Sequence, residues 1–101
     1  MTKQPWALIL GASSGFGEAT ALELARAGMN IFGVHMDRRD KLQRVEELQE
    51  KIHHYGRESH FVNGNAALDD KRKECVEELA RRMADPPGTL RVLMHLSLIH
   101  I

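Results

Sequence analysis

A glycine-rich turn lies between a short apolar run and an alanine-rich segment in LILGASSGFGEATALELARAG, residues 8–28. Residues 6–10 are continuously apolar, which is typical of a β-strand buried on both faces. Residues 14–27 have an apolar period near 3.6, which indicates a helix, and Gly28 follows as a stop signal. The turn therefore favours folds in which strands and helices alternate. One helical row is Phe16, Ala19, Leu22 and Arg26.

The rest of the chain continues this alternation. NIFGVHM (30–36) and ESHFVN (58–63) are predicted strands, and LRVLMHLSLI (90–99) is a third, set off by a Pro-Pro-Gly break. Two helices are predicted between them. The first carries an apolar stripe at Leu42, Val45, Leu48, Ile52 and Tyr55, ended by Gly56, and the second has an inner face of Val76, Leu79 and Met83.

Composition limits the environment and partners of the chain. Its 101 residues have a formal net charge of zero, so no overall field attracts nucleic acid or a membrane surface. A single cysteine, Cys75, excludes an internal disulfide and fits a reducing cytoplasm. No apolar run approaches the length of a membrane span. We expect a soluble cytoplasmic α/β protein with neither nucleic acid nor membrane as a partner.

The glycine turn has the chemistry of an anion site. Free N–H groups at the start of the helix and the helix dipole favour a pyrophosphate there. Gly11 permits the tight turn, Gly15 lets the backbone approach phosphate, and Gly17 allows close helix–strand packing. Ser13 and Ser14 offer hydroxyl groups to phosphate or ribose. The alternative is a glycine-rich connection that binds no ligand.

The motif GASSGFG, spaced Gly-x-x-x-Gly-x-Gly and followed by ATALELARAGMNIFGV, resembles the N-terminal half of the short-chain dehydrogenase/reductase family. The resemblance covers residues 6–95, with Leu10 standing where the family often has threonine. It implies a doubly wound, Rossmann-type parallel sheet in the order 3-2-1-4, whereas the order 2-1-3-4 would indicate a flavodoxin-like sheet. It also implies a nicotinamide dinucleotide coenzyme, NADP or NAD, held at the turn by Gly11, Ser13, Ser14, Gly15, Phe16 and Gly17.

The residue that contacts the adenosine ribose can be assigned in two ways. A spacing of about twenty residues beyond the last glycine points to Asp37. The family register points instead to His35, which does not repel a 2′-phosphate. Arg38 and Arg39 lie close enough in sequence to bind that phosphate, so we expect NADP. The alternatives are that these arginines are solvated charges and that Asp37 binds the ribose of NAD.

Two further positions match the family near the coenzyme. Asn65 and Ala66 correspond to the position that contacts adenine, and Asn65 can hydrogen-bond a base. The alternative is an ordinary turn from strand to helix. His95 resembles a histidine found in enoyl-carrier-protein reductases. No metal site is expected, because His53 and His54 are helix neighbours that point about 100° apart.

The family's chemistry needs a tyrosine acid, a lysine four residues later and an upstream serine. This chain has one tyrosine, Tyr55, and Ser59 stands four residues on. We therefore expect an inactive N-terminal fragment of an oxidoreductase that moves hydride between nicotinamide and a carbonyl, alcohol or enoyl thioester. The resemblance implies a homo-oligomeric parent. Alternatives are a non-catalytic dinucleotide-binding or regulatory module, and a domain for another phosphorylated ligand such as a flavin nucleotide.

Residues 96–101, LSLIHI, do not continue the family pattern. They match one reading frame of a transposase adaptor end used in sequencing libraries. We expect residues 1–95 to form a partial NAD(P)-binding domain and residues 96–101 to be a non-native tail. The coding nucleotides test this, since a different codon series would remove the adaptor interpretation.

Overall fold

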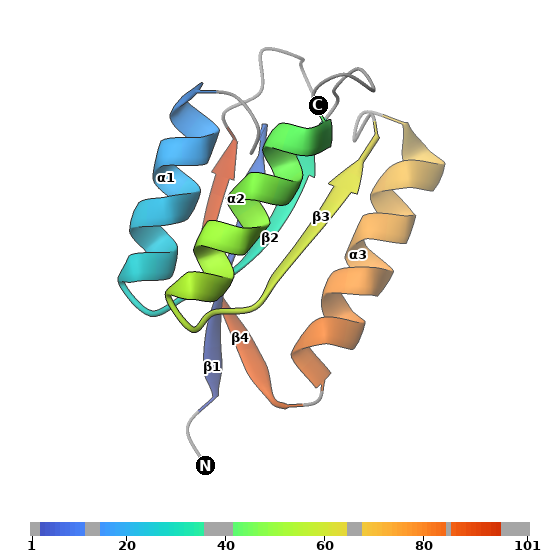
Figure 1. The fold of residues 1–101 in the computed structure, drawn as a ribbon. Helices are drawn as coiled ribbons and strands as arrows, with labels where there is room; N and C mark the ends of the chain where they lie inside the picture. The colour runs from blue at the N-terminus through green and yellow to red at the C-terminus, as the bar shows by residue number, and fades with distance from the viewer. Residues whose placement is uncertain (1–2, 12–14, 36–41, 65–67, 85, 96–101) are drawn as a thin grey trace.

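The computed structural model describes residues 3–11, 15–35, 42–64, 68–84 and 86–95. In these ranges the chain alternates strictly between strands and helices (Figure 1). In chain order the elements are β1 (Gln4–Leu10), α1 (Gly15–Arg26), β2 (Asn30–His35), α2 (Leu42–His54), β3 (Ser59–Asn63), α3 (Asp69–Ala84) and β4 (Gly88–His95).

All strand pairs are parallel, and the sheet order is β3-β2-β1-β4. The predicted order 3-2-1-4 is confirmed, and the flavodoxin-like order is excluded. The chain moves outward from β1 through β2 to β3, then returns across the sheet through α3 to place β4 on the other side of β1. The glycine turn after β1 therefore lies at the point where the order of the strands reverses, which is where open α/β sheets bind ligands.

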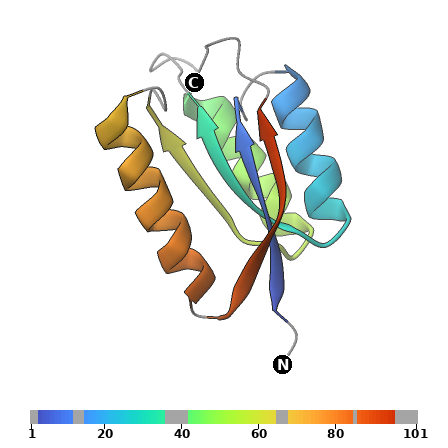
Figure 2. The ribbon, with the colours of Figure 1, turned by 180° about the vertical axis from the view of Figure 1, so that it is seen from behind.

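The sheet separates two apolar cores. On one face, β1 and β2 contribute Ala7, Ile9 and Ile31, which pack with buried residues of α1 and α2: Ala21, Ala25, Leu48 and Ile52. On the other face, the alternate side chains of the same strands pack against α3 in a cluster of Trp6, Phe32, Val34, Cys75 and Leu79. Viewed from behind, the strands lie in front of α2, and α3 lies along the β3 side of the sheet (Figure 2). A sheet covered on both faces explains the continuous apolar runs of β1 and β2.

The buried row of α1 consists of small residues. Gly17, Ala21 and Ala25 face the sheet, whereas Phe16 is 82% exposed. Residues four apart share a helix face, and this row contains only small side chains, so the helix axis can lie close to the strands. Of the row through Phe16, Leu22 is partly buried and packs against the same core.

The inner face of α3 is corrected. Cys75 and Leu79 are buried and Met83 is partly buried, but Val76 is 66% exposed. One residue step rotates a helix by about 100°, so Cys75 and Val76 cannot both face the sheet. Tyr55, predicted as the last member of the α2 stripe, lies just beyond that helix and is 46% exposed.

Two predicted helix stops are confirmed by backbone geometry. Gly28 (φ 104°) and Gly56 (φ 77°) have the left-handed conformation that glycine adopts after a helix. Element boundaries agree with the sequence prediction to within two residues, apart from those that fall outside the described ranges. These include the C-terminal end of the predicted strand 90–99, since residues 96–101 are not described.

Candidate functional site

The turn after β1 has the backbone geometry that the sequence predicts for its first glycine. Gly11 has φ 88°, and its N–H donates to the carbonyl of Val34 at 2.8 Å. Gly15 is the first residue of α1, and a Cβ added there would meet no heavy atom of the described residues within 4 Å beyond its chain neighbours and its own helix backbone. No described residue therefore fills the space in front of Gly15. Ser13 and Ser14 lie outside the described residues.

The start of α1 supplies the positive end of a helix dipole to this space. The first amide groups of a helix have no acceptor within the helix, so they can donate to an anion. Gly17 is buried in the first turn, in line with the row that packs on the sheet. The arrangement can bind a phosphate group through backbone N–H groups, with no cationic side chain of its own in this turn.

The ends of three neighbouring strands are joined beside the turn. The carbonyls of Val34 and His35, at the end of β2, accept from Gly11 N (2.8 Å) and Gly64 N (2.7 Å) respectively. His35 is 4% exposed, and its ring centroid lies 6.2 Å from that of Phe61. His35 therefore lies at the carboxyl edge of the sheet, with its imidazole packed inward. Asp37, Arg38, Arg39, Asn65 and Ala66 lie outside the described residues.

An ion pair at the same edge was not anticipated from the sequence. Arg44 Nη2, in the first turn of α2, lies 3.2 Å from Glu18 Oε2, in the first turn of α1. The pair joins residues 26 positions apart, so no local pattern identifies it. Its sequence signal is limited to one acidic and one basic residue near the starts of successive predicted helices.

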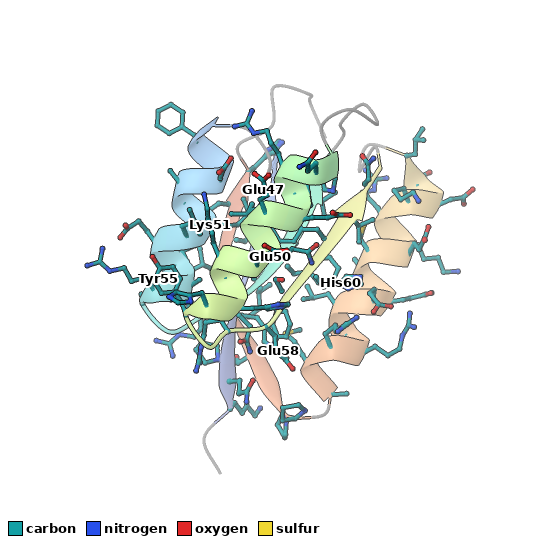
Figure 3. All side chains as sticks on the ribbon, viewed as in Figure 1. Glu47, Glu50, Lys51, Tyr55, Glu58 and His60 are labelled. Carbon is teal, nitrogen blue, oxygen red and sulfur yellow. The ribbon has the colours of Figure 1, made fainter. Side chains whose placement is uncertain are left out.

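The tyrosine of this chain lies at the opposite edge. Strands and helices run antiparallel to each other in a βαβ unit, so helix starts are found at the carboxyl edge of the sheet and helix ends at the amino edge. Tyr55 follows the end of α2, and its N–H donates to Ile52 O at 3.1 Å. Figure 3 shows it at the lower end of α1 and α2, away from the glycine turn. It is not placed to act at a ligand held by that turn.

An apolar cavity of about 240 Å³ lies on the α3 face. Strand residues Leu8, Leu10, Val34 and Leu93 line one side, and α3 contributes Arg72, Cys75, Val76 and Leu79. Burial is the main cause that raises the pKa of the Cys75 thiol, with the nearby Glu74 carboxylate adding to it. The thiol is therefore neutral at pH 7 and is not an activated nucleophile.

The described ranges also bear on metal sites and membrane spans. No three His, Cys, Asp or Glu side chains there are placed to share a metal ion. None of the helices described combines the length and the apolar character needed to cross a bilayer.

Comparison with known sequences identifies relatives over most of the chain. The model of the short chain dehydrogenase family matches residues 5–96. The 3-oxoacyl-(acyl-carrier-protein) reductase of Staphylococcus epidermidis is 34% identical over 90 residues, which are 88% of this chain and 34% of that protein. The very-long-chain 3-oxoacyl-CoA reductase of Meyerozyma guilliermondii is 32% identical over 90 residues, 89% of this chain and 25% of the relative. The chain thus spans about a third or less of these relatives.

Solved structures show the same fold. A short-chain dehydrogenase/reductase from Burkholderia xenovorans superposes with a TM-score of 0.80 at 21% identity, over 95% of this chain and 37% of that one. A 3-ketoacyl-ACP reductase from Sinorhizobium meliloti gives a TM-score of 0.71 at 29% identity, over 88% and 32% respectively. Together with the family match and the glycine turn at the strand-order reversal, these findings show that the chain belongs to the short-chain dehydrogenase family.

Proposed function

We propose that this chain is the coenzyme-binding portion of an NAD(P)-dependent oxidoreductase. The observation that carries the proposal is the turn between β1 and α1, where Gly11 has a left-handed backbone and Gly15 leaves open space before the start of a helix. A pyrophosphate has the charge and size to accept hydrogen bonds from such a turn.

The residues present fit a dinucleotide. Gly11, Gly15 and the first turn of α1 would hold the pyrophosphate, and the end of β2 would lie beside the adenosine ribose. Bound nicotinamide would supply or accept the hydride. In this proposal Ser13, Ser14 and Phe16 border the coenzyme. Phe16 is 82% exposed at the start of α1, so its ring is available to cover a ligand.

For the coenzyme, we propose NADP rather than NAD. His35 carries no negative charge, so it does not repel a 2′-phosphate, and Arg38 and Arg39 would bind it. Asn65 and Ala66 would contact the adenine.

For the substrate, we propose a 3-oxoacyl thioester, since the curated relatives are named as reductases of such compounds. An enoyl thioester is the alternative, and His95 at the end of β4 is the feature that favours it.

The chain by itself is proposed to bind coenzyme weakly at best and to lack turnover. Its one tyrosine is at the wrong edge of the sheet, and no lysine stands four residues after it. A parent enzyme would carry the Ser and Tyr-x-x-x-Lys residues beyond residue 95. A non-catalytic dinucleotide-binding module is the second candidate, and the same lack of a Tyr-x-x-x-Lys motif favours it. Genomic DNA beyond codon 95 separates the two, since the motif supports the enzyme and a native stop codon supports the module.

The proposal extends to the setting of the parent protein. The free Cys75 thiol suits a reducing cytoplasm. The parent is proposed to be a homo-oligomer, as the family resemblance implies. The genomic DNA sequence beyond codon 95 also tests whether residues 96–101 are a non-native tail.

The binding proposal is tested by titrating the 101-residue chain with NADPH and NADH by calorimetry. Gly15→Val places two methyl groups in the open space, and we expect affinity to fall at least tenfold, about 1.4 kcal/mol. Ala19→Val is the matched control, because it adds the same two methyls at an exposed position of α1. Equal affinity of Gly15→Val and the unmodified chain would contradict the site. NAD(P)H oxidation with 3-oxoacyl and enoyl thioesters is expected to be absent.

A further inference from the structure

The apolar cavity on the α3 face has a buried floor and an exposed rim. Val34 and Leu79 belong to the floor and are buried, whereas Val76 and Leu93 are exposed at the rim. The cavity lies between three strands and one helix, because β1, β2 and β4 each contribute lining residues opposite α3. A hollow of this form can admit a small molecule from solvent and hold it against apolar side chains on two sides.

The α3 side of the cavity follows from helical spacing. Its four lining residues stand three or four positions apart, which places them along one side of the helix: Arg72, Cys75, Val76 and Leu79. Arg72 is the one charged residue among all those that line the cavity. The apolar lining of α3 therefore ends at a guanidinium in the first turn of that helix.

The volume of the cavity sets the size of a ligand. An apolar cavity of about 150 Å³ is large enough to hold benzene, which has six carbon atoms. In proportion, the present cavity of about 240 Å³ has room for roughly nine carbon atoms. An alkyl chain of about eight carbons matches this volume, and burying its methylene groups favours binding.

Arg72 supplies charge complementarity at the mouth of the cavity. Its side chain is 48% exposed, so the apolar stem can lie against the lining while the guanidinium stays in water. The guanidinium pairs with Asp69, whose side chain is 90% exposed. Because a guanidinium has five N–H donors, this exposed pair leaves donors for a second anion. A carboxylate at the mouth would therefore gain charge-assisted hydrogen bonds.

We propose that this cavity binds a free, single-chain alkyl carboxylate of about eight carbons. The chain lies between α3 and the strands, and the carboxylate pairs with Arg72 at the mouth. The inference does not rest on the proposed coenzyme function, because α1, which begins at the glycine turn, packs on the opposite face of the sheet.

The head-group part of the proposal is tested by calorimetry on the 101-residue chain with octanoate, 1-octanol and octylammonium. We expect octanoate to bind more tightly than octylammonium. Arg72→Gln should weaken octanoate about fivefold and leave 1-octanol unchanged, since only the charge-assisted hydrogen bonds are lost. Arg81→Gln is the matched control, because Arg81 is an exposed arginine of α3 that does not line the cavity. It should change neither affinity.

The chain part of the proposal is tested at Cys75, the one cysteine of the sequence. Cys75→Leu places extra carbon atoms in the cavity, so octanoate and 1-octanol should both weaken at least about fivefold. Cys75→Ala leaves the cavity open and should bind both as the unmodified chain does. Urea unfolding checks that the variants fold. If Cys75→Leu does not fold, the unmodified chain decides the question, because bound octanoate should slow the reaction of Cys75 with N-ethylmaleimide.

Three results would overturn the inference. The first is no binding of octanoate by the unmodified chain, or equal binding by the unmodified, Arg72→Gln and Cys75→Leu chains. The second is a preference for octanoate over octylammonium that persists in Arg72→Gln, since another cation would then hold the head group. The third is binding to anionic phospholipid vesicles without binding of free octanoate. Loss of NADPH binding with octanoate binding intact would instead contradict the proposed function alone.

Discussion

At the scale of single residues, Asn30 joins the amino ends of three strands. Its Nδ2 donates to Gln4 Oε1 at 2.8 Å, and its Oδ1 accepts from Glu58 N at 2.9 Å. The side chain is 2% exposed, so water cannot replace either partner. A buried side-chain amide stabilises the fold when both its N–H and its oxygen are hydrogen-bonded. Removing that side chain leaves its buried partners without a hydrogen bond.

We predict that Asn30→Ala lowers the free energy of unfolding by about 2 kcal/mol, because the backbone N–H of Glu58 and the side-chain oxygen of Gln4 lose a buried hydrogen-bond partner. Urea unfolding of the chain measures this. Gln4→Ala removes one of the two bonds and should cost less. Equal stability of Asn30→Ala and the unmodified chain would show that the strand starts do not depend on this side chain.

At the scale of elements, His60 connects β3 to α3 (Figure 3). Its Nδ1 lies 3.0 Å from Arg82 Nη2 and its Nε2 lies 3.8 Å from Glu78 Oε1, while its ring lies 5.2 Å from that of Phe32. The arginine can only donate, so Nδ1 must accept, which requires the neutral ring with its proton on Nε2. Protonation of Nδ1 would therefore break the contact with Arg82.

The pKa of His60 is lowered from its ordinary value of 6.5, first by burial and then by the charges of Arg82 and Arg81, with Glu78 opposing them. The unfolded chain thus binds the proton more tightly than the folded one. We predict that the stability His60 contributes is present above pH 6.5 and is lost as the pH falls below it. Urea unfolding from pH 7.5 to 5 should show a shallower decline for His60→Gln, and identical slopes would contradict the prediction.

How far each element could be foreseen depends on whether its signal is local. The glycine stops, the apolar strand runs and the turn after β1 act through a few neighbouring residues, and all were found. Which side of a helix faces the sheet depends on the space left by a distant strand. That dependence explains the error at Val76. The Glu18–Arg44 pair and the burial of His35 required the relative placement of different elements, which no local pattern contains.

At the scale of the whole molecule, β4 is an edge strand with one open face. Leu90 and Leu93 are 40% and 63% exposed, and Leu93 lines the apolar cavity beside α3. Exposed apolar side chains on a strand with one unpaired edge favour association between chains. We expect this exposed apolar face of β4 to cause self-association of the 101-residue chain. The chain should therefore be poorly soluble.

We predict that Leu93→Gln increases the monomeric fraction measured by sedimentation velocity and changes the free energy of unfolding by less than about 0.5 kcal/mol, since the side chain is mainly exposed. Val92→Gln is the matched control. Val92 points to the opposite face and packs on the α1–α2 core, so its substitution should destabilise the fold instead. If the Leu93→Gln chain associates as strongly as the unmodified one, a surface other than the β4 face causes the association.

The end of β2 accepts hydrogen bonds from the amides of both Gly11 and Gly64. The exchange of these two amide hydrogens with solvent is consequently tied to the separation of β2 from its neighbours. Neither the Gly11 amide nor the Gly64 amide can exchange unless its hydrogen bond to β2 breaks. Deuterium uptake at Gly11 therefore follows sheet opening, and the first residue of the turn after β1 has the protection of a core amide.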